Sequence, residues 1–410
     1  MIYGINDRPP IWQLITSSFQ IMLACFAATA LIGNVCGMPI SGALVAPGIA
    51  TIICVLINRF KSPMFISNSG AFVAPVLAAS AIGGTFAVFV GGITSAIVYC
   101  VFGIVLSKIG VNNLYKFMPK VLIGSITVVI GVNLMPFIKD YVGGDQINMI
   151  IALITMISIA LCSHYLKGTI SLFPFLIGTL IGYIISIPFG LVNFEVFKGI
   201  SLFKIPTFAF MSWEPVALKA LIPLIVMTIA YTISAQCECI SDNAALGGII
   251  GKDLYREPGL ARIFIGEGIA NMVGTALGGL GQCSYGESIA TIGFSKNASV
   301  YTTIGGAVLM IIMGFLEPVQ AFISSIPTCV IGGGCAMVLY GFISSSGIKL
   351  LKDVDLNNQK NLIICSTVMS LGISGVVLGG NTFNITGTAL AIVVGVILNL
   401  ILKDKELSNG

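Results

Sequence analysis

Stretches of about twenty apolar residues follow one another along almost the whole chain, with short polar segments between them. A helix of that length crosses the hydrocarbon core of a bilayer. Charged residues make up only 9% of the sequence, whereas soluble domains contain about 25%. The sequence therefore predicts an all-α, polytopic membrane protein and excludes a soluble globular fold.

We expect fourteen transmembrane segments, of which the third and the tenth are interrupted by polar residues. They are expected at 11–35, 41–58, 63–80, 84–107, 119–138, 147–166, 170–190, 215–242, 258–279, 282–294, 298–320, 325–346, 361–379 and 384–402.

The basic residues support an even number of spans with both termini in the cytoplasm. In that arrangement sixteen of the twenty Lys and Arg residues lie in cytoplasmic segments. The other four, on the opposite side, are Lys139, Lys198, Lys204 and Lys219. Because cytoplasmic loops of membrane proteins carry an excess of Lys and Arg, we expect a multi-pass protein of the cytoplasmic membrane with N- and C-termini inside the cell.

The two interrupted spans have a composition unlike that of a lipid-facing helix. The third contains the run Ser-Asn-Ser-Gly at 67–70, and the tenth reads GLGQCSYGESIATIGFSK at 279–296. Non-helical backbone at membrane depth is tolerated only where it is buried in protein or lines a cavity. Each is the third span of its half, so the sequence predicts two repeats of seven spans. Because seven is odd, the second repeat is inverted.

A second pair of similar sequences supports the repeat. Pro-Lys-Val-Leu-Ile-Gly at 119–124 and Pro-Thr-Cys-Val-Ile-Gly at 327–332 each lie at the start of the fifth span of a half. Paired broken segments in inverted repeats place a binding site at their crossing near the midplane. We expect exposed backbone groups from Asn68 to Phe72 and from Tyr285 to Ser288. Their amides, with a helix starting next to them, suit a planar polar ligand.

Four acidic residues within the expected spans are candidates for function; Lys120, Lys219, Arg262 and Glu317 also fall within the span bounds, but near a span end. Glu238 and Asp242 are four residues apart and share a helix face. Glu267 lies between two glycines in the next span, and Glu287 lies in the tenth. Crowded carboxyls without a cationic partner favour protonation, and ionisable groups inside a membrane are functional by default. We therefore expect proton coupling; the alternative is that Glu238 and Asp242 lie solvated at a cytoplasmic helix end.

Several of these stretches also resemble a known family. The tenth span offers Glu287-Ser288-Ile289-Ala290, then four residues, then Ser295-Lys296. The eighth offers Glu238 with Asp242 four residues later, and the segments Lys-Asp-Leu at 252–254 and Glu-Pro-Gly-Leu at 257–260 follow it. Over essentially its whole length the chain is similar to the nucleobase–ascorbate transporter family (nucleobase:cation symporter-2), which includes uracil and xanthine permeases.

Four positions depart from the family pattern, and one of them is Ile21, which follows Gln20 in the first span where the family has His. Ser288 stands where the tenth-span signature has Asn, and Ala290 stands where it has Gly. Gly70 falls where uracil permeases present an aromatic residue against the base. A stacking group then has to come from elsewhere, and Tyr285 and Phe72 are the candidates.

The resemblance implies an architecture in two domains. Spans 1–4 and 8–11 form a core domain, residues 1–110 and 214–322. Spans 5–7 and 12–14 form a gate domain, residues 111–213 and 323–410. Short antiparallel strands in broken spans 3 and 10 cross at mid-membrane, and the protein works as a homodimer whose core moves against its gate.

A nucleobase presents N–H donors beside carbonyl acceptors, which suits carboxylates and backbone amides. We expect Glu238 and Glu287 to accept from ring N–H groups. Backbone amides near Gly70, Gly286 and Ser288 are expected to donate to carbonyl oxygens. Glu238, Asp242 and Glu267 are the expected proton-coupling residues, with Asp242 and Glu267 either carrying protons or orienting Glu238. No cofactor, metal or nucleic acid is expected.

The sequence leaves two substrates open. The run Tyr285-Gly286-Glu287 favours uracil, whereas Asp242 and Glu267 favour a purine such as xanthine; we favour uracil narrowly. A sulfate or bicarbonate transporter is a weaker alternative, because anion sites need uncompensated positive charge and the candidates here are acids. The sequence contains no nucleophile–base pair that would indicate an enzyme. Paired broken spans suit a transporter that opens alternately to the two sides of the membrane better than they suit a channel.

Overall fold

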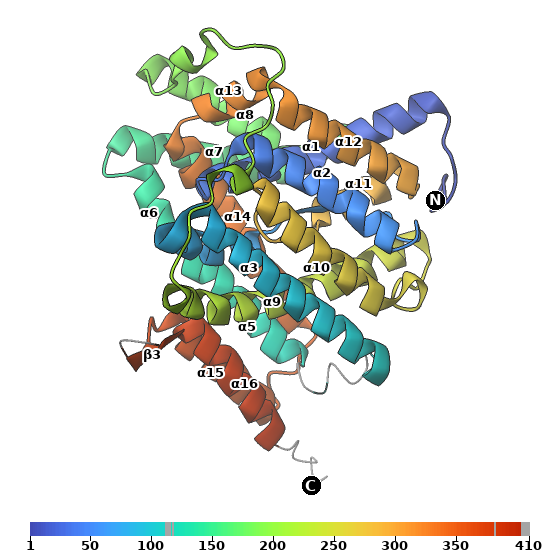
Figure 1. Cartoon of the computed structure of the whole chain (residues 1–410), viewed down its shortest axis with the longest axis vertical. Coiled ribbons are helices and arrows are strands. Elements are labelled where there is room, and N and C mark those ends of the chain that lie inside the picture. Colours follow the sequence, from blue (N-terminus) through green and yellow to red (C-terminus); the bar gives the residue numbers. More distant parts are fainter. Residues whose placement is uncertain (111–115, 117–118, 381–382, 403–410) are drawn as a thin grey trace.

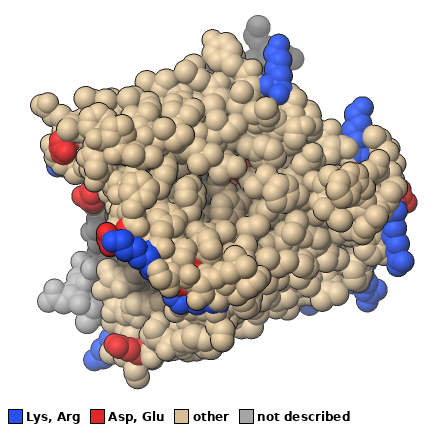
Figure 2. Space-filling view, turned by 90° about the horizontal axis from the view of Figure 1, so that it is seen from above, with Lys and Arg blue, Asp and Glu red and all other residues tan. Residues whose placement is uncertain are grey.

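The computed structural model describes residues 1–110, 116, 119–380 and 383–402. Most of them are helical, and the helices pack side by side in one body (Figure 1). The face shown in Figure 2 is almost entirely uncharged, with Lys and Arg at its margins. Such a surface fits a protein embedded in lipid, since charged side chains avoid the hydrocarbon region.

In the first half of the chain the described residues are mainly helical and form one short strand. Its main elements are α1 (Ile11–Val35), α2 (Ile40–Ile57), β1 (Ile66–Asn68), η1 (Gly70–Phe72), α3 (Val73–Ile109), α5 (Lys120–Leu134), α6 (Phe137–Val142), α7 (Gln146–Tyr165), η2 (Gly168–Leu172) and α8 (Pro174–Ser186). The short helices η3 (Ile187–Phe189), η4 (Phe194–Phe197) and η5 (Ala209–Ser212) lie in the connection to the second half.

The second half has one corresponding strand and an additional hairpin. Its elements are α9 (Leu218–Ile250), η6 (Tyr255–Gly259), α10 (Leu260–Leu277), β2 (Gln282–Ser284), α11 (Gly286–Ser295), α12 (Val300–Phe315), α13 (Glu317–Ser325), η7 (Cys329–Cys335), α14 (Ala336–Lys352), α15 (Gln359–Ile373), β3 (Val377–Gly380), β4 (Phe383–Thr386) and α16 (Gly387–Ile401).

Seven helices of the described residues are long and apolar enough to cross a membrane by length and composition. One of them contains the predicted third and fourth spans, because η1 and α3 run together from Gly70 to Lys108. Gly83 and Gly84 interrupt α3 with non-helical backbone angles, at the place where those two spans were expected to part. A count of fourteen spans remains a prediction.

The hairpin of β3 and β4 was not predicted. The two strands pair antiparallel, with Val377 opposite Thr386, where the sequence suggested the end of one membrane span and the start of the next. Helix α15 ends at Ile373, and Gly375 then adopts a φ of +69°, a left-handed conformation that favours glycine and stops a helix. The hairpin, α15 and α16 lie together at one end of the molecule (Figure 1).

The two broken segments meet as the sequence predicted. Strands β1 and β2 pair antiparallel, with Ile66 opposite Ser284 and Asn68 opposite Gln282. All six strand residues are buried. Outside the strands, the Ser69 amide donates to Gly281 O at 2.9 Å and the Tyr285 amide donates to Phe65 O at 3.1 Å. The crossing thus pairs backbone groups that no water or lipid could satisfy at this depth.

Buried amide side chains complete the crossing. The Asn68 Oδ1 atom accepts from Gln282 Nε2 at 2.7 Å and from the Leu280 amide at 3.0 Å. The Asn68 Nδ2 atom donates to Ala43 O at 3.0 Å, which ties β1 to α2. The Asn271 side chain bonds both backbone groups of Gln282 and so ties β2 to α10. Strands of three residues form few backbone hydrogen bonds with each other, and these side chains add further hydrogen bonds at the crossing.

Helices α3 and α10 approach each other closely beside the crossing. A Cβ atom at Gly268 would lie only 3.0 Å from Ala96 O and from Tyr99 Cβ. Small residues let helix backbones approach in this way. The glycines around Glu267 therefore allow α10 to bring this carboxyl against β2.

Candidate functional site

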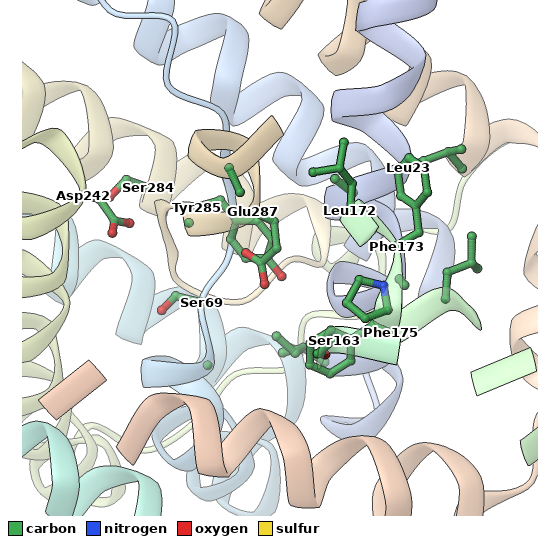
Figure 3. Close-up of a pocket in the computed structure, with 18 of the residues that line it drawn as sticks. Leu23, Ser69, Ser163, Leu172, Phe173, Phe175, Asp242, Ser284, Tyr285 and Glu287 are labelled. Carbon is green, nitrogen blue, oxygen red and sulfur yellow. The ribbon is translucent and has the colours of Figure 1, made fainter. Parts of the chain in front are cut away.

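A cavity of about 530 Å³ opens beside the crossing (Figure 3). Ligand pockets generally measure about 300–1,000 Å³. One wall comes from α9, the end of β1 and the start of α11, and the opposite wall from the connection of α7 to α8, from α1, whose Leu23 lies beside Leu172 and Phe173 (Figure 3), and from α14. The first wall contains Ser69, Gly70, Glu238, Asp242, Ser284, Tyr285, Gly286, Glu287 and Ala290, and the second contains Ser163, Ser171, Leu172, Phe173, Phe175, Ser345 and Lys349.

Two predicted carboxylates face this cavity from different helices. Glu238 lies on α9 with an exposed side chain, and Glu287 lies half-buried in the first turn of α11. The two carboxyls are close enough to interact electrostatically, and the Ser69 hydroxyl interacts with Glu238. Helix N-termini carry unpaired N–H groups and a partial positive charge. The geometry therefore sets two hydrogen-bond acceptors beside backbone donors.

The other two acids lie progressively deeper. Asp242 lines the cavity one turn from Glu238, and the Ser284 hydroxyl interacts with its carboxyl (Figure 3). Glu267 is completely buried and does not line the cavity; its Oε1 atom accepts from the Ser284 amide at 3.2 Å. Within the described part of the chain, Asp242 Oδ2 and Glu267 Oε2 are buried without a hydrogen-bond partner.

Ser284 joins these acids, because its hydroxyl meets Asp242 and its amide meets Glu267. Asp242 also interacts electrostatically with both Glu238 and Glu267. Three carboxyls thus extend from the cavity into the protein interior. A proton taken up at one of them changes the charge felt by the next.

Tyr285 lies at the start of α11 and lines the cavity, although only 7% of its surface is exposed. Its hydroxyl interacts with Thr29 of α1, and the Thr29 and Ser67 hydroxyls lie 2.6 Å apart. These hydroxyls hold the tyrosine ring between α1 and the crossing. Gly70 and Gly286, two other predicted residues, also line the cavity.

Ser288 and Phe72 differ from their predicted positions at the cavity. The Ser288 amide and hydroxyl both donate to Tyr285 O, at 3.0 and 2.7 Å, inside the first turn of α11. Phe72 is 3% exposed and packs behind the crossing, where its ring leaves no room for a side chain at Gly281. Neither residue is among those that line the cavity.

The second wall of the cavity was not predicted from the sequence. Phe173 and Leu172 lie where an ordinary apolar span was expected to start, and Lys349 lies near the end of another. No local pattern marks such residues, since only the packing of distant segments brings them to the site. Ser69 and Ser284 had a signal, because each is next to a residue that was selected.

A family model described as "Permease family" matches residues 12–379 of this chain. The chain belongs to the nucleobase–ascorbate transporter family, of the uracil/xanthine permease type. It is similar to a uracil permease of Bacillus caldolyticus, with 35% identity over an alignment of 421 residues. The alignment covers 98% of this chain and 95% of the relative. A uracil permease of Bacillus subtilis (strain 168) is 32% identical over 421 residues, with the same coverage.

Among solved structures, the chain resembles the transmembrane domain of a cyanobacterial bicarbonate transporter, BicA. The TM-score is 0.68, the identity is 14%, and the match covers 95% of this chain and 97% of that one. At this identity the likeness concerns the fold only. Family and fold together make the protein a multi-pass membrane transporter and not an enzyme.

Proposed function

We propose that this nucleobase permease imports uracil together with protons across the cytoplasmic membrane. The observation that carries the proposal is the pair of carboxylates, Glu238 and Glu287, that face one cavity beside the start of α11. The relatives named uracil permease over nearly the whole chain support this substrate. In this proposal the two carboxylates accept from ring N–H groups, and amides near Gly70 and Gly286 donate to carbonyl oxygens.

A purine such as xanthine is the second candidate, because it presents the same alternation of N–H and carbonyl groups. The presence of Asp242 beside Glu238 favours it, as does a cavity of about 530 Å³. A bicarbonate substrate is disfavoured although a bicarbonate transporter shares the fold. Three carboxylates line the wall near the crossing, and their negative charge repels an anion.

Competition of substrates tests the proposal. In vesicles that contain the purified protein, labelled uracil should accumulate with saturation, and excess unlabelled uracil should abolish that uptake. Unlabelled xanthine, guanine and thymine are expected to compete less well, since the amides and carboxylates match the edge of uracil. Stronger competition by xanthine than by uracil would assign the protein to purines, and inhibition by bicarbonate alone would overturn a nucleobase substrate.

Proton coupling is the second part of the proposal, and it is supported by the series Glu238, Asp242 and Glu267 leading inward from the cavity. Uracil uptake should rise several-fold when the outside is made one pH unit more acidic than the inside, and it should acidify the vesicle lumen. A pH-sensitive dye in the lumen measures this. Uptake that ignores the pH gradient but follows a Na⁺ gradient would contradict it.

We further propose fourteen spans in two inverted repeats. The order of elements supports this, because β1 precedes η1 and α3 in one half as β2 precedes α11 in the other. Pro119 precedes α5, and Pro327 lies shortly before η7. In this proposal residues 1–110 and 214–322 form the core domain, residues 111–213 and 323–410 form the gate domain, the termini lie in the cytoplasm and the protein is a homodimer.

A further inference from the structure

The two walls of the cavity differ in chemistry (Figure 3). The wall at the crossing contains the carboxylates, the hydroxyls of Ser69 and Ser284 and the start of α11. The opposite wall contains Leu172, Phe173 and Phe175 of the connection between α7 and α8. Its helix η2 contacts α11 directly. A ligand held at Glu287 therefore lies between a wall that carries the carboxylates and a wall that presents aromatic rings beside the polar side chains of Ser163, Ser171, Ser345 and Lys349.

Phe173 and Phe175 have different surroundings. Phe175 is 7% exposed and belongs to an apolar cluster with Leu31 and Ile159. Phe173 is only half-buried, and it belongs to neither of the two apolar clusters that the described residues form. Packing of the protein interior therefore accounts for Phe175, whereas the ring of Phe173 is left to the cavity.

The backbone at Phe173 is held from both sides. Its amide donates to Ile170 O at 3.1 Å in η2, and its carbonyl accepts from the Ile177 amide at 3.1 Å in α8. Pro174 is the first residue of α8, and its ring fixes the φ angle that follows Phe173. A side chain between two such elements is positioned before a ligand arrives, which lowers the entropic cost of contacting it.

We propose that Phe173 is a substrate-contacting residue that packs against the face of the base while Glu238 and Glu287 accept from its edge. The inference rests on the proposed nucleobase substrate. Carboxylates satisfy only the edge of a planar ring, and both faces still need apolar contact. Tyr285 lies on the wall at the crossing and Phe173 on the opposite wall, so together they can enclose the ring from both sides.

This role has a distinctive consequence for specificity. Stacking tolerates any base, because every base has a π-face, whereas the edge groups read the pattern of donors and acceptors. Loss of Phe173 should therefore weaken the binding of uracil and the binding of xanthine by a similar factor. Loss of a carboxylate should weaken binding more strongly for the base whose edge matches the carboxylates and amides better.

The experiment is equilibrium binding of labelled uracil to the purified full-length protein. Phe173→Ala should bind uracil about tenfold more weakly than the wild type, and Phe173→Tyr, which keeps a planar ring, should stay within about twofold. Ile170→Ala is the matched control, because Ile170 belongs to the same connection but is 55% exposed and does not line the cavity. Its affinity should be unchanged.

Phe173→Leu keeps apolar volume and removes the planar ring, which protects the test against a variant that fails to fold. It should unfold at the wild-type temperature and bind several-fold more weakly. Wild-type affinity in Phe173→Leu or Phe173→Ala would overturn the role of Phe173 while uracil remains the substrate. A wild-type protein that binds no nucleobase would instead overturn the proposed function.

Discussion

Replacement of Glu287 by Gln is expected to weaken uracil binding about 100-fold and to abolish uptake at micromolar uracil. Glu287 faces the cavity from the first turn of α11. A hydrogen bond to a charged group contributes about 1.5–3 kcal/mol, and about 2.7 kcal/mol corresponds to 100-fold in affinity. The amide of Gln keeps the size of the side chain but removes the charge and adds N–H donors opposite the ring N–H groups. Equilibrium binding and uptake by vesicles measure the two effects.

The same variant should fold at least as well as the wild type. Glu287 belongs to none of the ion pairs that the described residues form, so removal of its charge leaves no ion-paired cation without a partner and removes a desolvation cost. Glu195→Gln is the control, since Glu195 lies in an exposed ion pair with Lys198 and does not line the cavity; its uptake should equal that of the wild type. Near-normal uracil affinity in Glu287→Gln would remove Glu287 from the site.

The sequence predicted those parts of the fold that depend on composition. Apolar runs indicated the helices, and the polar runs around Asn68 and Gln282 indicated the two breaks. The short antiparallel strands in those breaks were implied by the resemblance to the family. Both cavity carboxylates on α9 and α11 followed from their position in apolar surroundings. A charged residue in such a segment is rare enough to be informative by itself.

The parts that depend on three-dimensional packing were not predictable. Phe72 points behind the crossing because of the way η1 turns after β1. Ser288 contacts Tyr285 because of the way α11 begins. Phe173 reaches the cavity because η2 packs on α11, a contact between segments more than 100 residues apart. The type of a residue does not specify such contacts, since an apolar side chain packs equally well against lipid, the protein interior or a ligand.

The largest effect on stability is expected from Asn68→Leu. This change removes the acceptor of Gln282 Nε2 and of the Leu280 amide, and the donor to Ala43 O. Each buried group left without a partner costs about 1–3 kcal/mol, and neither water nor lipid can replace the partner. We expect a marked drop in the unfolding temperature of the purified protein and loss of uracil binding. Gln146→Leu, at an exposed amide in the first turn of α7, should change neither.

The pair of amides also allows a stricter test, because removal of both partners of a hydrogen bond costs less than removal of one. Gln282→Leu alone takes a donor from Asn68 Oδ1, and Asn68→Leu alone leaves Gln282 Nε2 with only one of its two acceptors, Leu280 O. The double variant Asn68→Leu/Gln282→Leu removes both amides together. If the amides act as one network, the loss of stability in the double variant should be smaller than the sum of the two single losses. Strict additivity would mean that the crossing is held by its strands alone, with the amide contacts contributing no coupling of their own.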